Sequence, residues 1–229
     1  MKKNIENIIT DNYKKDMLIR MVHSSTAIEG NTLTLSEVNS ILINKYIPRE
    51  MTEKEYTEVK NYRNIFPILL NLDEKILTPE IIKIYNKVIM TDLREDAGLY
   101  KRTNNIILGA NFETVKPYKI PYEMQNWCDD YNFKIKNAKT NKEKVEVILE
   151  QHIKFEKIHP FADGNGRTGR LLIVDSCFRE KLIPIIIPHL EKNKYINFLA
   201  QENLKDFTNW GLELQKNELD KILLFQNNR

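Results

Sequence analysis

The glycine-rich stretch from His159 to Arg170, HPFADGNGRTGR, constrains the fold most because helical patterns flank it on both sides. The run from Arg167 to Glu180 is apolar-rich and has no glycine or proline beyond Gly169. Before the stretch, residues recur at the three- and four-residue spacing of a helix: Val145, Ile148, Leu149, His152 and Ile153. Residues 164–169 match G-x-G-x-x-G, but a dinucleotide-binding unit needs a strand before its glycines. The sequence therefore predicts a turn between two helices in a mainly α fold.

This turn has the composition of a phosphate-binding site. Gly164, Asn165 and Gly166 allow successive N–H groups to turn inward as an anion-binding nest. The helix that follows adds unpaired N–H groups and its positive dipole end. Arg167 and Arg170 are three residues apart and lie on one face of the first helical turn, where two cations need an anion. A P-loop is excluded because no Gly-Lys-Ser/Thr ending exists.

Two further side chains in the stretch suit chemistry on a bound phosphate. Asp163 offers a hard carboxylate oxygen, which Mg²⁺ accepts when a nucleotide supplies most of the other ligands. His159 is the only side chain there that takes up a proton near pH 7. A metal site made of His152 and His159 lacks a third ligand at suitable spacing. The sequence therefore predicts His159 as a base and Asp163 as a metal ligand.

At every fixed position, residues 159–170 resemble the signature of Fic-domain proteins, with the usual acidic residue at Asp163. A second segment, Ser25–Asn31, resembles the inhibitory motif of the same family. The resemblance implies that Glu29 would pair with the second signature arginine, Arg170, and take the place of the nucleotide γ-phosphate. Local physics agrees, because Glu29 falls in the last turn of a predicted helix over residues 14–29, where the dipole repels a carboxylate.

The resemblance implies one compact, mainly α Fic-type domain with a short β-hairpin flap over the active site. Residues 1–50 would be N-terminal helices, including the inhibitory helix, packed on a Fic core of residues 51–229. The helical period disappears between Gly98 and Pro121, and a hairpin is predicted from about Asn105 to Pro117. Its edge would hold the target chain by β-augmentation. The flap residues are Ile106, Ile107 and Leu108.

The activity that the resemblance implies is transfer of AMP from ATP to a Ser, Thr or Tyr hydroxyl of a target protein or of the chain itself. Mg²⁺ or Mn²⁺ would assist, and pyrophosphate would be released. Nucleotide contacts are expected from Gly164, Asn165, Gly166, Arg167, Arg170, Tyr195 and Asn203, with core packing as an equal alternative for Tyr195. The inhibitory residues are Ser25 and Glu29.

Three other functions stay open at this point. Glu29 could activate water, so that the same site removes AMP from a modified protein. The signature reads phosphates more than bases, so another nucleotide could be transferred. A non-enzymatic binding module is disfavoured because it has no reason to keep a base and a metal ligand together.

Composition indicates a globular protein of 229 residues with 41% hydrophobic and 29% charged residues. The net charge of +3 is too small to indicate a nucleic-acid surface. Cys128 and Cys177 lack metal-ligand spacing, and neither a signal peptide nor a membrane span is recognisable. We therefore expect a soluble cytoplasmic protein. The sequence does not fix the target, the signal that releases Glu29, or whether the chain forms a homo-oligomer.

Capping signals predict where several helices start. Thr34 to Glu37 is a capping box for a helix that runs towards Lys45. Thr78 and Pro79 are an N-cap with proline at the first helical position. Further helices are expected over residues 52–72, from residue 121 or 122, over 142–158 and from residue 192 or 193, with two closing helices after that.

Overall fold

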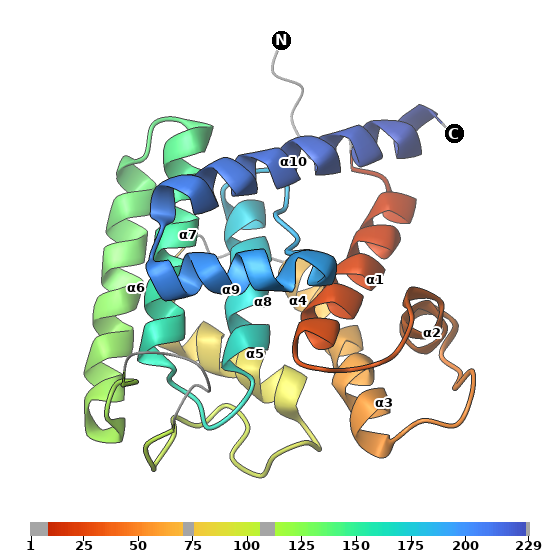
Figure 1. Cartoon of the computed structure of the whole chain (residues 1–229), viewed down its shortest axis with the longest axis horizontal. Helices are drawn as coiled ribbons and strands as arrows, with labels where there is room; N and C mark the ends of the chain where they lie inside the picture. The colour runs from red at the N-terminus through yellow and green to blue at the C-terminus, as the bar shows by residue number, and fades with distance from the viewer. Residues whose placement is uncertain (1–8, 71–75, 106–112, 228–229) are drawn as a thin grey trace.

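The computed structural model describes residues 9–70, 76–105 and 113–227, and the regular elements in these ranges are helices (Figure 1). The α-helices are α1 (Asp11–Ile28), α2 (Leu35–Asn39), α3 (Glu53–Lys60), α4 (Ile65–Leu70), α5 (Pro79–Met90), α6 (Ile120–Asn137), α7 (Asn141–Ile158), α8 (Asn165–Arg179), α9 (Lys192–Gln201) and α10 (Leu204–Asn227). Short turns of other helix types are η2 (Ser40–Asn44), η3 (Asn61–Asn64), η4 (Pro117–Lys119) and η5 (His189–Glu191).

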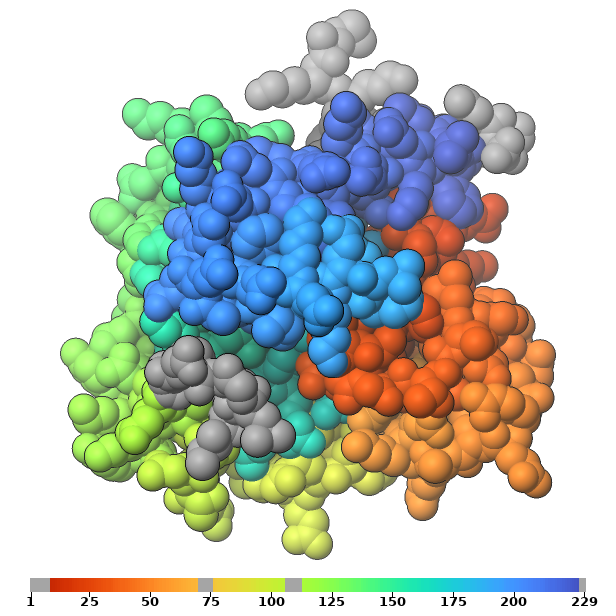
Figure 2. Space-filling view, in the orientation of Figure 1, coloured from red at the N-terminus to blue at the C-terminus, as the bar shows by residue number. Residues whose placement is uncertain are grey.

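Helix α8 lies in the middle of the bundle, with α6 and α7 on one side and α1 to α3 on the other (Figure 1). Helix α7 packs against α6, α8 and α10, while α5 and α1 also contact α8. Helices α9 and α10, in blue, cover one face beside α1, in red (Figure 2). One hydrophobic core runs through these elements, and α8 is buried along most of its length. The segment that follows the glycine-rich turn is therefore the centre of the fold.

Helix α1 is held at both ends. Near its start, the Tyr13 hydroxyl donates to Glu218 Oε1 on α10 at 2.8 Å, and Arg20 forms an ion pair with the same carboxylate at 2.6 Å. At its end, Lys192 Nζ donates to the carbonyl oxygen of Ile28 at 2.6 Å. Gly30 follows with φ of 98°, a left-handed conformation that glycine adopts without strain and that stops the helix.

The predicted helix starts are largely confirmed because capping is a local interaction. Thr34 and Thr52 each form a capping box with the glutamate three residues later. Thr78 accepts from the N–H of Ile81, with Pro79 at the first position. Thr140 forms a third capping box and starts α7 one residue before the predicted position.

Several predicted boundaries differ from the structure, among them the start of α1, which is Asp11 rather than residue 14. The helix expected to reach Lys45 changes into the π-helical turn η2, and the helix expected over residues 52–72 is divided into α3, η3 and α4. The two predicted closing helices are the single helix α10. Its internal Gly211 is there for packing, because a Cβ at that position would lie 2.7 Å from Leu149 Cδ1 on α7.

Among the described residues there is no strand, only an isolated antiparallel bridge between Tyr100 and Phe161. The flap residues Ile106, Ile107 and Leu108 lie outside the described residues. No helix in the described part of the chain is both long and apolar enough to cross a bilayer. The division at residue 50 stays a prediction.

Candidate active site

The predicted base, His159, ends helix α7 in a left-handed conformation with φ of 51°. Pro160 cannot continue the helix, and a side chain at positive φ costs about 1–3 kcal/mol, so the surrounding structure must hold His159 in place. Its Nδ1 lies 3.3 Å from the carbonyl oxygen of Glu156, which can only accept, so this nitrogen carries the proton and Nε2 has the free lone pair.

The His159 ring is neutral at physiological pH. Burial is the largest effect and lowers the pKa of His159 to about 4, because a charged imidazolium would lose its hydration. The positive charge of Lys101 acts in the same direction, whereas the carbonyl of Glu156 and the negative charges of Glu29 and Asp163 oppose it. The side chain is 19% exposed, so Nε2 is available as a proton acceptor.

The turn between α7 and α8 is held by side-chain amides. Asn165 accepts the N–H of Phe161 at 2.9 Å and donates to the carbonyl of Phe161 at 2.8 Å. Asn86, on α5, donates to the carbonyl of Asp163 at 3.1 Å and accepts the N–H of Gly98 at 2.9 Å. The predicted nest residue Asn165 therefore uses its side chain to fix the turn, which the sequence analysis did not foresee.

Helix α8 begins without a side-chain cap, because its N-cap is Gly164 in a left-handed conformation with φ of 76°. The first N–H groups of a helix have no carbonyl partner within that helix, here those of Asn165, Gly166 and Arg167. Gly166 keeps the space in front of them open: a Cβ there would lie 2.5 Å from Glu29 Oε1 and 2.9 Å from Arg170 Nη1. The carboxylate of Glu29 therefore lies against Gly166 in the uncapped first turn of α8, where an anion is stabilised.

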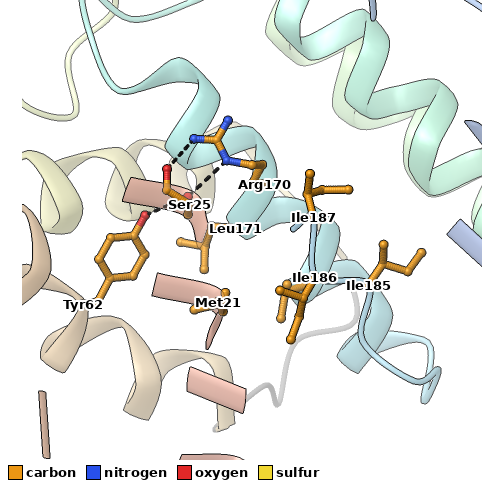
Figure 3. A pocket seen from close by; sticks show the side chains of 9 residues that line it. Met21, Ser25, Tyr62, Arg170, Leu171, Ile185, Ile186 and Ile187 are labelled. Carbon is orange, nitrogen blue, oxygen red and sulfur yellow. Dashed lines mark hydrogen bonds between the residues drawn. The ribbon is translucent and has the colours of Figure 1, made fainter. Parts of the chain in front are cut away.

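Arg170 binds the end of α1 through three hydrogen bonds. Its Nη2 donates to Glu29 Oε1 at 2.6 Å. The other two bonds go to Ser25: Nη2 donates to the Ser25 carbonyl at 2.8 Å, and Nε donates to Ser25 Oγ at 3.2 Å (Figure 3). Tyr62 lies behind Ser25, with its hydroxyl 3.4 Å from Ser25 Oγ. Burial would raise the pKa of Glu29, but the charge of Arg170 and its hydrogen bond outweigh burial and lower it. The pairing of Glu29 with Arg170 expected from the sequence is thus present as a contact.

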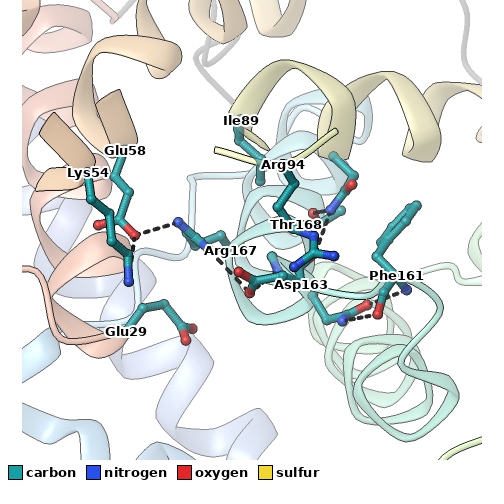
Figure 4. A network of polar contacts seen from close by, with 12 residues as sticks. Glu29, Lys54, Glu58, Ile89, Arg94, Phe161, Asp163, Arg167 and Thr168 are labelled. Carbon is teal, nitrogen blue, oxygen red and sulfur yellow. Dashed lines mark hydrogen bonds and ion pairs between the residues drawn. The ribbon is translucent and has the colours of Figure 1, made fainter. Parts of the chain in front are cut away.

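Arg167 is paired with two carboxylates rather than being free. Its Nη1 donates to Glu58 Oε1 on α3 at 3.0 Å, and its Nη2 donates to Asp163 Oδ1 at 3.4 Å (Figure 4). The Arg167 and Glu58 side chains are buried, whereas the Asp163 side chain is 54% exposed. No pattern in the sequence singled out Glu58, because the pair joins residues that lie 109 positions apart.

The Asp163 carboxylate is accessible to a divalent cation, because its side chain is 54% exposed. One half-exposed carboxylate fits Mg²⁺, which is commonly bound by one or two protein carboxylates together with nucleotide phosphates and water. Within the described residues no group of three or more His, Cys, Asp or Glu could hold a metal by itself. The donor set therefore fits a metal that arrives with a nucleotide.

The two predicted adenine-pocket residues have other contacts. Tyr195 is buried; its hydroxyl lies 2.8 Å from His152 Nε2, and its ring centroid lies 5.9 Å from Arg170 Cζ. Asn203 accepts the N–H of Asp206 at 3.2 Å in the first turn of α10. Their contact with a nucleotide stays a prediction.

Two groups near His159 were not anticipated from the sequence. Glu156 is buried, its Oε1 has no hydrogen-bond partner among the described residues, and burial raises its pKa to about 7. Lys101 Nζ donates to Asn105 Oδ1 at 2.5 Å and to Thr114 Oγ1 at 2.9 Å, which ties together the two described ends that flank residues 106–112. Burial lowers the pKa of Lys101 to about 8.

The family and sequence comparisons cover the region that contains this site. Residues 76–175 match the model of the Fic/DOC family. Proteins named protein adenylyltransferase Fic are 28% identical over 197 residues in Nematostella vectensis and 27% identical over 216 residues in Drosophila willistoni. These matches cover 84% and 92% of this chain but only 45% and 42% of the relatives, so the chain spans less than half their length.

The solved structures show the same fold. A Fic-domain-containing signaling protein from Bacteroides thetaiotaomicron superposes with a TM-score of 0.83 at 24% identity, covering 96% of this chain and 97% of that one. Helix α1 and Glu58 lie outside the residues that the family model matches.

Proposed function

We propose that the protein is a protein adenylyltransferase of the Fic/DOC family, whose model matches residues 76–175 and whose fold the described helices share. It would transfer AMP from ATP to a Ser, Thr or Tyr hydroxyl of a target protein, or of its own chain, and release pyrophosphate. One observation carries the proposal: a neutral, partly exposed His159 precedes a helix whose uncapped first turn has a carboxylate, bound by Arg170, lying against Gly166. A proton acceptor and an anion site are the two parts that this transfer needs.

The reaction follows from these positions. His159 Nε2 removes the proton from the acceptor hydroxyl as its oxygen attacks the α-phosphorus of ATP. The new bond joins that oxygen to phosphorus, and the bond between phosphorus and the bridging oxygen of pyrophosphate breaks. The N–H groups at Asn165 and Gly166 stabilise the charge on the α-phosphate oxygens. This division of labour is typical of phosphoryl transfer, where placement and charge stabilisation do most of the work.

Asp163 would hold the Mg²⁺ or Mn²⁺ that accompanies ATP. When bound, the metal spreads the negative charge of the phosphates and of the leaving pyrophosphate. The Asp163 carboxylate accepts the N–H of Gly164 at 2.6 Å, which fixes one oxygen and leaves the half-exposed group facing the nucleotide side.

We further propose that Glu29 inhibits this reaction. Its carboxylate pairs with Arg170 and lies against Gly166, so it takes up the part of the anion site that the terminal phosphate would need. While Glu29 holds Arg170, the phosphates of an entering ATP would be displaced from in-line attack, and the terminal phosphate would reach its productive position only by replacing Glu29. Since the pKa of Glu29 is lowered, this group is an anion and a weak base, which favours inhibition over water activation.

The test compares the wild-type protein with Glu29→Gly in the presence of ATP labelled at the α-phosphate, Mg²⁺ and a cell lysate. Label should enter protein mainly with Glu29→Gly and be absent when His159→Ala is added to it. Glu50→Gly, which changes an exposed loop glutamate, is the matched control and should behave like wild type. Labelling of the chain without lysate would reveal self-modification. Transfer that persists without His159 would refute the mechanism, and release of AMP from a labelled target only when Glu29 is present would favour AMP removal.

A further inference from the structure

The two signature arginines are both neutralised by carboxylates, but the two carboxylates differ in burial. Arg170 pairs with Glu29, whose side chain is 37% exposed. Arg167 pairs with Glu58 at 3.0 Å, and the two side chains are 5% and 6% exposed. A half-exposed carboxylate can be replaced by a phosphate from solution. A buried carboxylate cannot leave without stranding a buried charge, so Glu58 stays in place when a nucleotide binds.

Glu58 is fixed from its other side as well. Its Oε2 accepts from Asn31 Nδ2 at 2.9 Å, and the same amide nitrogen donates to the carbonyl of Glu55 at 3.2 Å. Asn31 is in turn oriented by the N–H of Leu33, which donates to its Oδ1 at 3.0 Å. Glu58 therefore presents one oxygen to Arg167 in a single orientation.

The orientation of Arg167 then determines which guanidinium nitrogen faces Asp163 and at what distance. With Nη1 on Glu58, the second nitrogen Nη2 faces Asp163 Oδ1 at the longer distance of 3.4 Å (Figure 4). The stronger and drier contact is with Glu58, so most of the guanidinium charge is balanced there. Asp163 keeps its negative charge for another cation.

We propose that Glu58 is a positioning residue for the metal-nucleotide site: by neutralising and orienting Arg167, it keeps Asp163 available to the divalent cation that accompanies ATP. This inference rests on the proposed function for the identity of the ligand. Without the Glu58 charge, Arg167 would bind Asp163 more tightly and repel the cation. The effect should be specific to the metal, because Arg170 and the first turn of α8 bind phosphate directly.

The test is calorimetric titration of ATP in a series of Mg²⁺ concentrations and without Mg²⁺, in the Glu29→Gly protein. Glu58→Gln should raise the Mg²⁺ concentration for half-maximal enhancement of ATP affinity about tenfold, the effect of removing an outer partner of a metal ligand. ATP affinity without Mg²⁺ should be unchanged or tighter. Glu58→Asp keeps the charge and should return the Mg²⁺ requirement towards that of the parent. Glu50→Gln, which changes an exposed loop glutamate, is the control and should cause no shift.

The pair with Arg167 gives the decisive comparison. In an Arg167→Gln background, Glu58→Gln should not change the Mg²⁺ requirement, because no guanidinium remains to be oriented. Two results would overturn the inference and make Glu58 a purely structural residue. One is that Glu58→Gln lowers ATP affinity equally with and without Mg²⁺. The other is that Glu58→Gln raises the Mg²⁺ requirement by the same factor in the Arg167→Gln protein. If ATP binding keeps the expected pattern but no variant transfers AMP, the proposed function fails and the role of Glu58 stands. If the parent protein binds no ATP, both fail.

Discussion

Replacing Glu29 by glutamine should lower the free energy of unfolding of the unliganded protein. The same substitution should make the free energy of ATP binding more favourable by the same amount. In the free protein Glu29 neutralises Arg170, whose side chain is only 6% exposed, so the substitution strands a buried guanidinium. Breaking a fully buried pair costs about 3–5 kcal/mol, and the 37% exposure of Glu29 reduces this to about 1–2 kcal/mol. Wild-type protein must give up this contact when the terminal phosphate binds, whereas Glu29→Gln has already lost it.

The assay is urea unfolding with and without saturating Mg²⁺·ATP, together with calorimetric ATP titration. Without ATP, the free energy of unfolding of Glu29→Gln should be about 1–2 kcal/mol lower than that of the wild type, and its ATP affinity should be about 5–30-fold higher. At saturating ATP the two proteins should have nearly the same free energy of unfolding, since both then hold Arg170 with phosphate. Glu50→Gln is the control and should change neither quantity. Equal destabilisation with and without ATP, with no gain in affinity, would refute the idea that Glu29 occupies the phosphate position.

Three further predictions concern the base His159, the turn held by Asn165, and the helix cap at Asn203. Since burial lowers the pKa of His159 to about 4, this base stays unprotonated at the pH values where an ordinary histidine titrates. The transfer rate of the Glu29→Gly protein should therefore fall only as the pH approaches 4. A fall of the rate with its midpoint near pH 6.5, while circular dichroism shows the protein still folded, would contradict this. Asn165→Ala leaves the N–H and carbonyl of Phe161 without partners and should lower the free energy of unfolding by about 2–3 kcal/mol in urea denaturation. Asn203→Ala removes only an exposed cap of α10, so we expect a loss of about 1 kcal/mol in the same experiment and unchanged ATP affinity; a large affinity loss would restore the predicted adenine contact.

The sequence allowed the local structure to be predicted better than the contacts between distant elements. Thr34 and Thr78 cap helices through residues three positions away, so their neighbours alone determine the outcome. The sequence also predicted that Arg170 lies in the first turn of its helix and that Glu29, at the end of another helix, pairs with a cation. Glu58 was not, because its role depends on the packing of α3 beside α8, which no local pattern encodes. The contacts of the Asn165 amide were not predictable for a different reason: an anion-binding nest requires only the backbone of Asn165, and its side-chain partner, the backbone of Phe161, is set by the shape of the turn.

The attachment of α1 indicates how Glu29 could be released without moving the whole helix. The start of α1 is fixed to α10 through Tyr13 and Arg20 on Glu218, a buried carboxylate. Its end is held by the Glu29 pair with Arg170, by the Ser25 contacts with Arg170, and by the hydrogen bond from Lys192 to the carbonyl of Ile28. Beyond Glu29 the chain turns at Gly30, where a Cβ would meet nothing within 4 Å. Glu29 lies just beyond the helix and its side chain is 37% exposed, so rotation of this side chain takes the carboxylate from Arg170 while Ile28, in the last turn of α1, stays buried in the core. A phosphate that competes for Arg170, or a partner that binds the end of α1, needs to offset only that local free energy to free the site.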